Sequence, residues 1–362
     1  MVWDIRKKLI EGITLFLQRM YYRISYKPLK LSAEAIGDFP PSYQLDDVPW
    51  IATKESYCQS NTLQMIVAQK GIEKPRGYLN FLMGFTYGAF EMPAGLGLFP
   101  YTDPETGFVV AAPYLGLVRR YYVTNDKSLY LDALRYYLSQ GYPVRVGLNA
   151  CTLRGEECQW PHSELLVGYD EMSFYYYETV MDEPRHLPPG EKGIQVPYQT
   201  LLEAVQGQAK IFSYPYRYSL TIFEEGPVEE DLGPIWARNG RSLIGGAAYT
   251  YWGAGAIERL AKRVKEWGIE LDVSKVRWGI DAAAYTRRDN ATYLREAFAG
   301  QADIERAADL FDEAAKLYVE ALSALEKGIA NQAEADGIAG MLSRAAAIER
   351  EIGKIFLARG SK

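Results

Sequence analysis

The sequence predicts an α+β protein in which a mixed region of helices and strands is followed by an all-helical region. From residue 46 to about residue 225, short strand-like runs alternate with helical patterns. From residue 235 onward the chain is rich in alanine, helical in pattern and poor in strand signals. A length of 362 residues is typical of about two domains. We therefore expect a lead at 1–45, a mixed domain at 46–225 and a helical domain at 226–362.

Composition narrows the class of protein. With 48% hydrophobic and 24% charged residues, the chain has the balance of a soluble globular protein. A formal net charge of −6 makes nucleic acid an unexpected partner. The three cysteines cannot all pair, so we expect no disulfide framework and a reducing compartment, the cytoplasm.

The lead begins with an amphipathic helical pattern in "MVWDIRKKLIEGITLFLQRMYYRI". Apolar residues recur there at helical spacing, namely Ile5, Leu9, Ile13, Phe16 and Met20. Glu11 and Gln18 interrupt the stretch and no small-residue cleavage site follows, which argues against a signal peptide. We expect a helix that docks on the protein, with contact to a membrane surface as the less favoured alternative. No segment is long and apolar enough to span a bilayer.

The mixed region contains four clear strand patterns and two clear helices. The strands are expected in "PVRVGLNA", "ELLVGYD", "FYYYETV" and "YSLTIFEE", and the helices in "CQSNTLQMIVAQKG" and "KSLYLDALRYYLSQG". Gly141 and Pro143 mark the end of the second helix and the turn into its strand. The segment "YDEMS" is expected to be a hairpin turn between two of the strands.

Two long helices with regular apolar seams are expected to close the chain. The first seam runs through Ile304, Ala308, Phe311, Ala315, Tyr318, Leu322 and Leu325. The second runs through Ile338, Met341, Ala345, Ile348, Ile352 and Ile355. The two helices are predicted to form an antiparallel hairpin packed on its own domain or on a second copy, giving a homodimer. The glycines of "RNGRSLIGGAAYTYWGAGAIERLA" match no phosphate-binding motif, so we expect them to allow close helix packing.

Cys58 is the first candidate for a chemical role. It stands in "SYCQSNTLQMIVAQKG", where a turn gives way to a helix. Backbone N–H groups and the helix dipole favour a thiolate at such a position. A small buried hydrophobe under the helix start is the plainer alternative.

A nucleophilic cysteine needs a base, and the chain has two histidines. His162 precedes an apolar strand, whereas His186 lies in a loop rich in proline and glycine. A histidine at the start of a strand can be held rigidly across a cleft, so His162 is the better candidate base. The following hairpin would bring Glu178 toward His162 as the third member of a triad, with Asp182 as the alternative.

Two structural alternatives compete with this assignment. His162 could be a strand-edge residue bonded to a backbone carbonyl. Alternatively, Cys58, Cys151, Cys158 and His162 could bind zinc, although the gap between Cys151 and Cys158 is unlike the short spacings of structural zinc sites. We expect no metal and no cofactor.

Longer stretches carry a family resemblance. "LDDVPWIATKESYCQSNTLQMIVAQKG" resembles the opening of papain-like peptidases of the bacteriocin-leader (double-glycine) type, which begin with a "VPxxxQ" strand and a "CG" helix start. "QGYPVRVGLNA" and "HSELLVGYDEMSFYYYET" are similar to their second half. The closest resemblance is to the N-terminal acyltransferase domain of the butirosin biosynthesis protein H family, in which a helical domain follows. The resemblance implies a papain-like fold with Cys58 as nucleophile, His162 as base and Glu178 at the acid position.

Three positions depart from the family pattern. Thr53 stands where the oxyanion-hole glutamine is expected, and Gln59 replaces the glycine after the cysteine. Glu178 is one methylene longer than the usual aspartate. Thr53, Gln59 and the backbone N–H of Cys58 are thus the candidate oxyanion donors, and losing one such donor typically costs about a hundred- to a thousand-fold in turnover.

The sequence therefore predicts cysteine-dependent acyl transfer. The enzyme would be an acyltransferase or an amide or thioester hydrolase acting on a small-molecule, carrier-bound or peptide-like acyl substrate. The alternative is a catalytically inert papain-fold protein that binds a ligand or serves as a scaffold.

Overall fold

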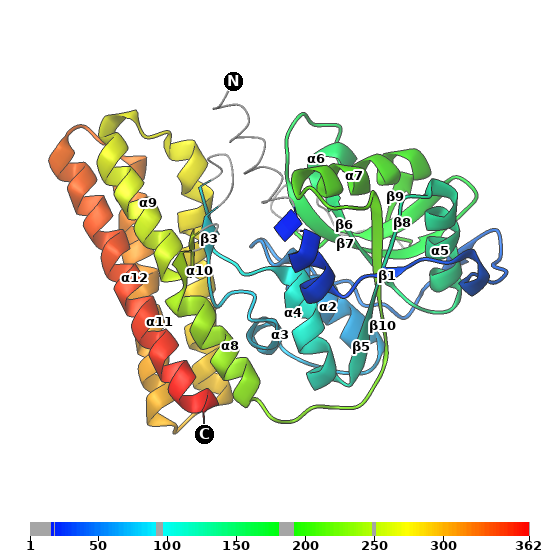
Figure 1. Ribbon diagram of the computed structural model, residues 1–362, viewed down its shortest axis with the longest axis horizontal. Helices are drawn as coiled ribbons and strands as arrows, with labels where there is room; N and C mark the ends of the chain where they lie inside the picture. The colour runs from blue at the N-terminus through cyan, green and yellow to red at the C-terminus, as the bar shows by residue number, and fades with distance from the viewer. Residues whose placement is uncertain (1–15, 18, 92–96, 181–191, 248–250, 362) are drawn as a thin grey trace. The chain divides into compact units, whose positions relative to one another are not determined.

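The computed structural model describes residues 16–17, 19–91, 97–180, 192–247 and 251–361 (Figure 1). Contacts divide the chain into two compact units, of which the first combines 1–74 with 108–229 and the second combines 75–107 with 230–362. The first holds a mixed sheet with helices and the second a bundle of long packed helices, so the predicted α+β class is confirmed. The boundaries differ from those expected, because residues 75–107 belong to the helical unit and the lead belongs to the sheet unit.

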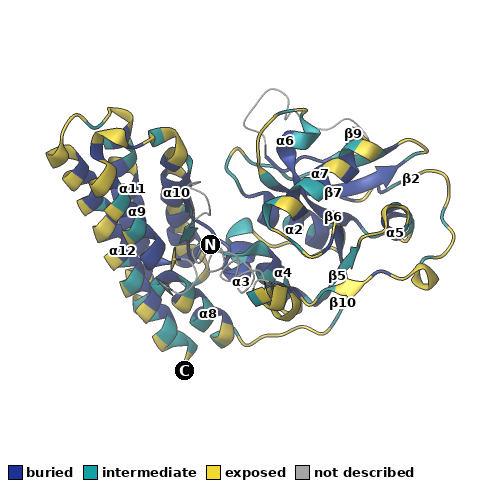
Figure 2. Cartoon of the chain, turned by 45° about the horizontal axis from the view of Figure 1, so that its top comes forward, coloured by how far each residue is buried: buried dark blue, intermediate teal, exposed yellow. Residues whose placement is uncertain are grey.

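The first unit is built on a sheet of eight strands among the described residues, in the order β1-β5-β10-β6-β7-β8-β9, with β2 beside β7. All pairs are antiparallel except β1 with β5. The strands are β1 Leu29–Lys30, β2 Tyr43–Gln44, β5 Leu117–Thr124, β6 Val144–Asn149, β7 Pro161–Tyr169, β8 Ser173–Tyr177, β9 Ile194–Pro197 and β10 Tyr218–Glu225. The four strands expected from the sequence are β6, β7, β8 and β10, and β6 and β7 are almost wholly buried (Figure 2).

Helices of this unit include both of those expected from the sequence. They are α2 Cys58–Gln69, α5 Lys127–Ser139, α6 Ala150–Leu153 and α7 Tyr198–Ile211, with the 3-10 helices η1 Ala33–Ala35 and η3 Ala112–Leu115. The helix α4 Pro104–Ala111 crosses the boundary between the units. The carboxylate of Asp126 caps α5 by accepting the N–H of Leu129 at 3.1 Å, which fixes where that helix begins.

The N-terminal helix docks through a different face from the one predicted. Residues 16–26 are helical where they are described, but Phe16 is 61% exposed and Met20 is 44% exposed. Tyr22 and Tyr26 are buried instead, in a cluster of tyrosines that includes Tyr121. Edge-to-face ring contacts favour this face, and spacing alone could not distinguish it. Ile5, Leu9, Ile13, Glu11 and Gln18 lie outside the described residues.

Among the residues that the structure describes, the second unit has five α-helices from the C-terminal part of the chain and one from its middle. They are α3 Arg76–Met83, α8 Gly233–Ile244, α9 Ala254–Trp267, α10 Val273–Ala297, α11 Ala302–Glu326 and α12 Gln332–Gly360, with η5 Gly268–Glu270. A small sheet joins β3 Phe90–Glu91, β4 Leu98–Phe99, β11 Gly246–Ala247 and β12 Tyr251–Trp252. The expected closing hairpin is formed by α11 and α12. A further long helix, α10, packs on α11 and was not predicted from the sequence.

The seams of the closing hairpin lie in the core of this unit. Phe311 and Ile352 are fully buried, whereas Leu322 and Ile348 are partly buried at the margin. Gly240 of α8 allows the close approach of α12, because a Cβ at this position would lie 2.7 Å from the carbonyl oxygen of Gly353. Gly240 therefore serves helix packing, as the sequence predicted, whereas Gly245 and Gly253 flank the helices with positive φ angles of 67° and 57°.

A buried ion pair ties the middle segment to the bundle. The side chains of Arg287 in α10 and Glu349 in α12 are both 0% exposed and form two hydrogen bonds, of 2.8 Å and 2.9 Å. Arg287 also donates to the carbonyl oxygens of Thr86 and Gly88, while the Tyr318 hydroxyl donates to Glu349 at 2.7 Å. The guanidinium therefore holds residues from the 75–107 segment against the long helices.

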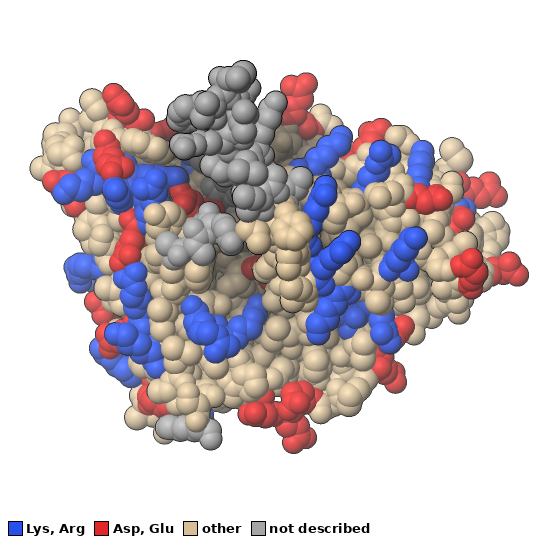
Figure 3. Space-filling view, in the orientation of Figure 1, with Lys and Arg blue, Asp and Glu red and all other residues tan. Residues whose placement is uncertain are grey.

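Both signs of charge occur on the surface. The face shown in Figure 3 carries basic and acidic side chains on each unit. No described helix is both long enough and apolar enough to cross a bilayer.

Candidate active site

Cys58 is the first residue of α2. As the first helical residue, it lies among the N–H groups that have no partner within the helix. The residue is 9% exposed and its thiol is the free one, because the other two cysteines are paired. α2 packs on β7, and the hydroxyl of Thr62 lies 3.3 Å from that of Ser163 on β7. The start of α2 thus carries a reactive group to the beginning of a buried strand.

His162 lies on that strand, one residue after β7 begins, and is 2% exposed. Cys58 is one of the groups whose charge raises the pKa of the His162 ring, so the thiol lies near the imidazole. Nε2 of His162 lies 2.9 Å from Oε1 of Glu178. Burial lowers the pKa of His162, but the negative charges available at Cys58, Glu164 and Glu178 outweigh it, and the pKa lies well above its usual range. The site therefore favours the protonated form of the imidazole.

Glu178 follows the end of β8 and is held by several donors. Its Oε1 accepts the backbone N–H groups of Thr179 at 2.9 Å and Val180 at 3.1 Å, in addition to the imidazole. Its Oε2 lies 3.6 Å from Nη2 of Arg154, at the end of α6. The expected contact between Glu178 and His162 is thus present, as the hairpin geometry predicted. Asp182 and His186 lie outside the described residues.

Glu164 is a second carboxyl group at the same imidazole, and the sequence reasoning missed it. It is 0% exposed, and its Oε1 lies 3.2 Å from Nε2 of His162. Burial and the charge of Glu178 raise the pKa of Glu164 to about 8, against the lowering effect of His162. The sequence did contain this information. Side chains two residues apart on a strand share one face, so "HSE" places Glu164 on the same face as His162.

Thr53 does not present a free hydroxyl donor. Its backbone joins Val180 in an isolated parallel bridge beside the site. Its hydroxyl donates to the carbonyl oxygen of Glu55 at 3.0 Å and accepts from Nδ2 of Asn61 at 2.9 Å. The expectation that Thr53 supplies an oxyanion donor is not supported by this arrangement, because its one proton is engaged locally.

Gln59 remains the side-chain candidate for the oxyanion donor. Its Oε1 accepts from Nη2 of Arg145 at 2.9 Å, and Arg145 is also held by Ser163 at 2.9 Å. Because an arginine can only donate, this contact fixes which end of the amide is oxygen. The amide nitrogen of Gln59 is therefore the end of the side chain that does not bind Arg145. Arg145 is buried, and no sequence pattern indicated its role.

Cys151 and Cys158 form a disulfide across a sequence separation of 7, with Cα atoms 5.5 Å apart. The expectation of no disulfide is therefore wrong, and the disfavoured zinc alternative is excluded because two of its three sulfurs are bonded to each other. An odd number of cysteines only requires that one remain free, and here that one is Cys58. The argument from cysteines for a reducing compartment also loses its basis, because disulfides are typical of oxidising compartments. The bridged loop contains Arg154, the residue that faces Glu178.

Two groups of described residues bring three potential metal-binding atoms within 4.8 Å of one another. In the group of Cys151, Glu156 and Cys158, the sulfurs are bonded to each other. In the group of His162, Glu164 and Glu178, the histidine nitrogen is already engaged by a carboxylate. We assign a metal to neither group.

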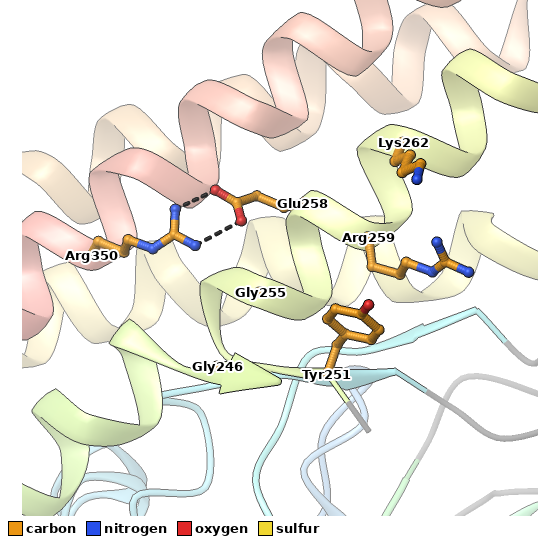
Figure 4. A pocket seen from close by; sticks show the side chains of 7 residues that line it. All are labelled: Gly246, Tyr251, Gly255, Glu258, Arg259, Lys262 and Arg350. Carbon is orange, nitrogen blue, oxygen red and sulfur yellow. Dashed lines mark hydrogen bonds and ion pairs between the residues drawn. The ribbon is translucent and has the colours of Figure 1, made fainter. Parts of the chain in front are cut away.

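The helical unit has a hollow of its own, shown in Figure 4. It has a volume of about 340 Å³ and is lined by Gly246, Tyr251, Gly255, Glu258, Arg259, Lys262 and Arg350. Arg350 and Glu258 form a two-bond ion pair, and the guanidinium of Arg259 lies 5.6 Å from the ring centre of Tyr251. This lining contains no thiol and no imidazole, so the candidate active site remains at Cys58.

Comparisons with known proteins identify no relative. No protein-family model matches the chain, and no curated protein matches it.

Proposed function

We propose that this chain is a cysteine-dependent acyl-transfer enzyme whose sheet-containing unit has a papain-like fold. The observation that carries the proposal is the arrangement of Cys58, His162 and Glu178. A thiol at a helix start lies near an imidazole whose Nε2 is 2.9 Å from a carboxylate oxygen. These are the nucleophile, base and orienting acid of a triad, recognised by geometry and role.

The chemistry follows from the groups present. The thiolate of Cys58 attacks the carbonyl carbon of the substrate, and a C–S bond forms as the carbonyl becomes an oxyanion. His162 then gives its proton to the leaving group, whose bond to carbon breaks to leave a thioester. Water or an amine attacks the thioester in the second step, with His162 now accepting a proton. The product is a carboxylic acid or a new amide, and the thiol is regenerated.

The oxyanion would be stabilised by the N–H of Cys58 and the side-chain amide of Gln59. Both belong to the first turn of α2, where the helix dipole also favours negative charge. The substrate is proposed to be a small-molecule, carrier-bound or peptide-like acyl compound.

One observation favours an inert papain-fold protein as the second candidate. The hydroxyl of Thr53 is engaged by Glu55 and Asn61, so the position of the usual oxyanion glutamine supplies no donor. In that case the unit would bind a ligand or act as a scaffold without turnover.

A panel of thioester and peptide-amide probes tests the proposal. Wild type should turn over at least one probe, and Cys58→Ser and His162→Ala should each lower turnover by more than about a thousand-fold. The control is Glu171→Gln, an exposed carboxylate in the turn between β7 and β8, which should leave turnover unchanged. Turnover that survives both active-site substitutions contradicts the mechanism. No turnover of any probe by wild type favours the inert candidate.

A further inference from the structure

The carboxyl group of Glu164 is fully buried at the candidate site, and the mechanism above assigns it no role. Its side chain is 0% exposed, and neither carboxylate oxygen makes a well-aligned hydrogen bond in the described structure. An isolated carboxylate in such a place is costly, and the usual response is that the group binds a proton.

Sheet register places Glu164 against a second carboxyl group. Leu165 of β7 pairs with Tyr177 of β8, so Glu164 and Glu178 are the next residues along the two neighbouring chains. Like charges directly opposite each other on adjacent strands destabilise a sheet. The charge of Glu178 is stabilised by the guanidinium of Arg154 and by two backbone N–H donors, whereas Glu164 has no comparable group of donors. Of the two, Glu164 is therefore the one suited to remain neutral.

The remaining neighbours do not supply a compensating cation. On its own strand Glu164 faces His162, and from β8 it faces Tyr176 and Glu178. From β6, the uncharged Val146 lies opposite it. The imidazole is already engaged by Glu178 at 2.9 Å, and the guanidinium of Arg154 also lies beside Glu178, so an ionised Glu164 would have no cation of its own.

We propose that Glu164 is a fourth member of the Cys58 site, a positioning residue that must carry its proton for the site to work. The inference rests on the proposed function, because it concerns how His162 performs its steps. When Glu164 loses its proton to solvent, a second carboxylate faces Nε2 of His162. That charge stabilises the imidazolium, which then gives up its proton to the leaving group less readily, and acyl transfer slows.

The ionisation of Glu164 determines how activity should depend on pH. The pKa of Glu164 is raised to about 8, so the group is neutral below that value and ionised above it. Activity should therefore fall as pH rises through about 8. Glu164→Gln resembles the protonated form at every pH, so the alkaline limb should move upward by about one pH unit or more, toward the ionisation of His162. The control Glu171→Gln should keep the wild-type limb.

Difference infrared spectroscopy tests the protonation without any substrate. Wild type at about pH 6 should show the carbonyl stretch of a carboxylic acid that disappears by about pH 10 and is missing from Glu164→Gln. If this band is present but no probe is turned over, the proposed function fails and the protonation of Glu164 stands. A band that persists unchanged in Glu164→Gln, or an alkaline limb that the substitution does not move, overturns the inference.

Discussion

The buried pair of Arg287 and Glu349 allows a sharp stability prediction for the helical unit. Replacing Glu349 by glutamine keeps the side-chain volume but removes the charge that faces the guanidinium. Both side chains are 0% exposed, so water cannot take the place of the lost partner. Breaking such a pair on one side typically costs about 3–5 kcal/mol, because it leaves a buried charge uncompensated.

The carbonyl oxygens of Thr86 and Gly88 still accept from Arg287 in this variant, which favours the lower end of that range. For a unit of this size, about 3 kcal/mol corresponds to a fall in melting temperature of roughly 6–12 °C. Calorimetry of wild type and Glu349→Gln measures the shift.

An exposed ion pair in the same bundle provides the matched control. Arg277 and Glu326 lie 2.7 Å apart, but their side chains are 64% and 44% exposed. Glu326→Gln should cost no more than about 1 kcal/mol. The double variant Arg287→Met with Glu349→Leu should be less destabilised than Glu349→Gln, because it leaves no unpaired charge. Equal shifts for Glu349→Gln and Glu326→Gln would refute the reasoning from burial.

Three further predictions concern stability, each measured by urea unfolding. Phe311→Ala should lower the free energy of unfolding by about 3–5 kcal/mol, because the ring is fully buried. Val319→Ala on the same helix, at a position 52% exposed, should change it by less than about 0.5 kcal/mol. Equal effects of the two substitutions would show that the seam is not packed. Replacing Cys151 and Cys158 by serine should cost about 2.5 kcal/mol through loss of a short closed loop, and a neutral result would show that the bridge does not constrain the unfolded chain. Asp126→Ala should cost about 1 kcal/mol by removing the cap of α5, while Asp126→Asn should retain most of the wild-type stability.

Local patterns were enough to predict the elements that carry the candidate site. The strand-like runs "ELLVGYD" and "FYYYETV" with "YDEMS" between them predicted a hairpin, and a hairpin brings Glu178 back toward His162. The turn before "CQSNTLQ" predicted that Cys58 would begin a helix. Each of these inferences depends on residues that are close in the chain.

Features that depend on distant contacts were not predictable in this way. Residues 75–107 join the helical unit through contacts such as those of Arg287 with Thr86 and Gly88, about two hundred residues away in sequence. The engagement of the Thr53 hydroxyl depends on Asn61, a side chain whose direction no spacing rule gives. Glu164 was within reach of the period-two rule, but its raised pKa depends on burial and on Glu178.

The reactivity of Cys58 tests the central claim most directly. Without reductant, Cys58 is the free thiol of the chain, so intact-mass measurement after iodoacetamide treatment reports on it alone. At about pH 6 an ordinary thiol with a pKa near 8.5 is scarcely ionised, whereas a thiolate paired with an imidazolium reacts readily. We expect wild type to be alkylated at least about tenfold faster than His162→Ala at this pH. Equal rates in the two proteins, or a thiol that stays unlabelled until the chain is unfolded, would contradict the account.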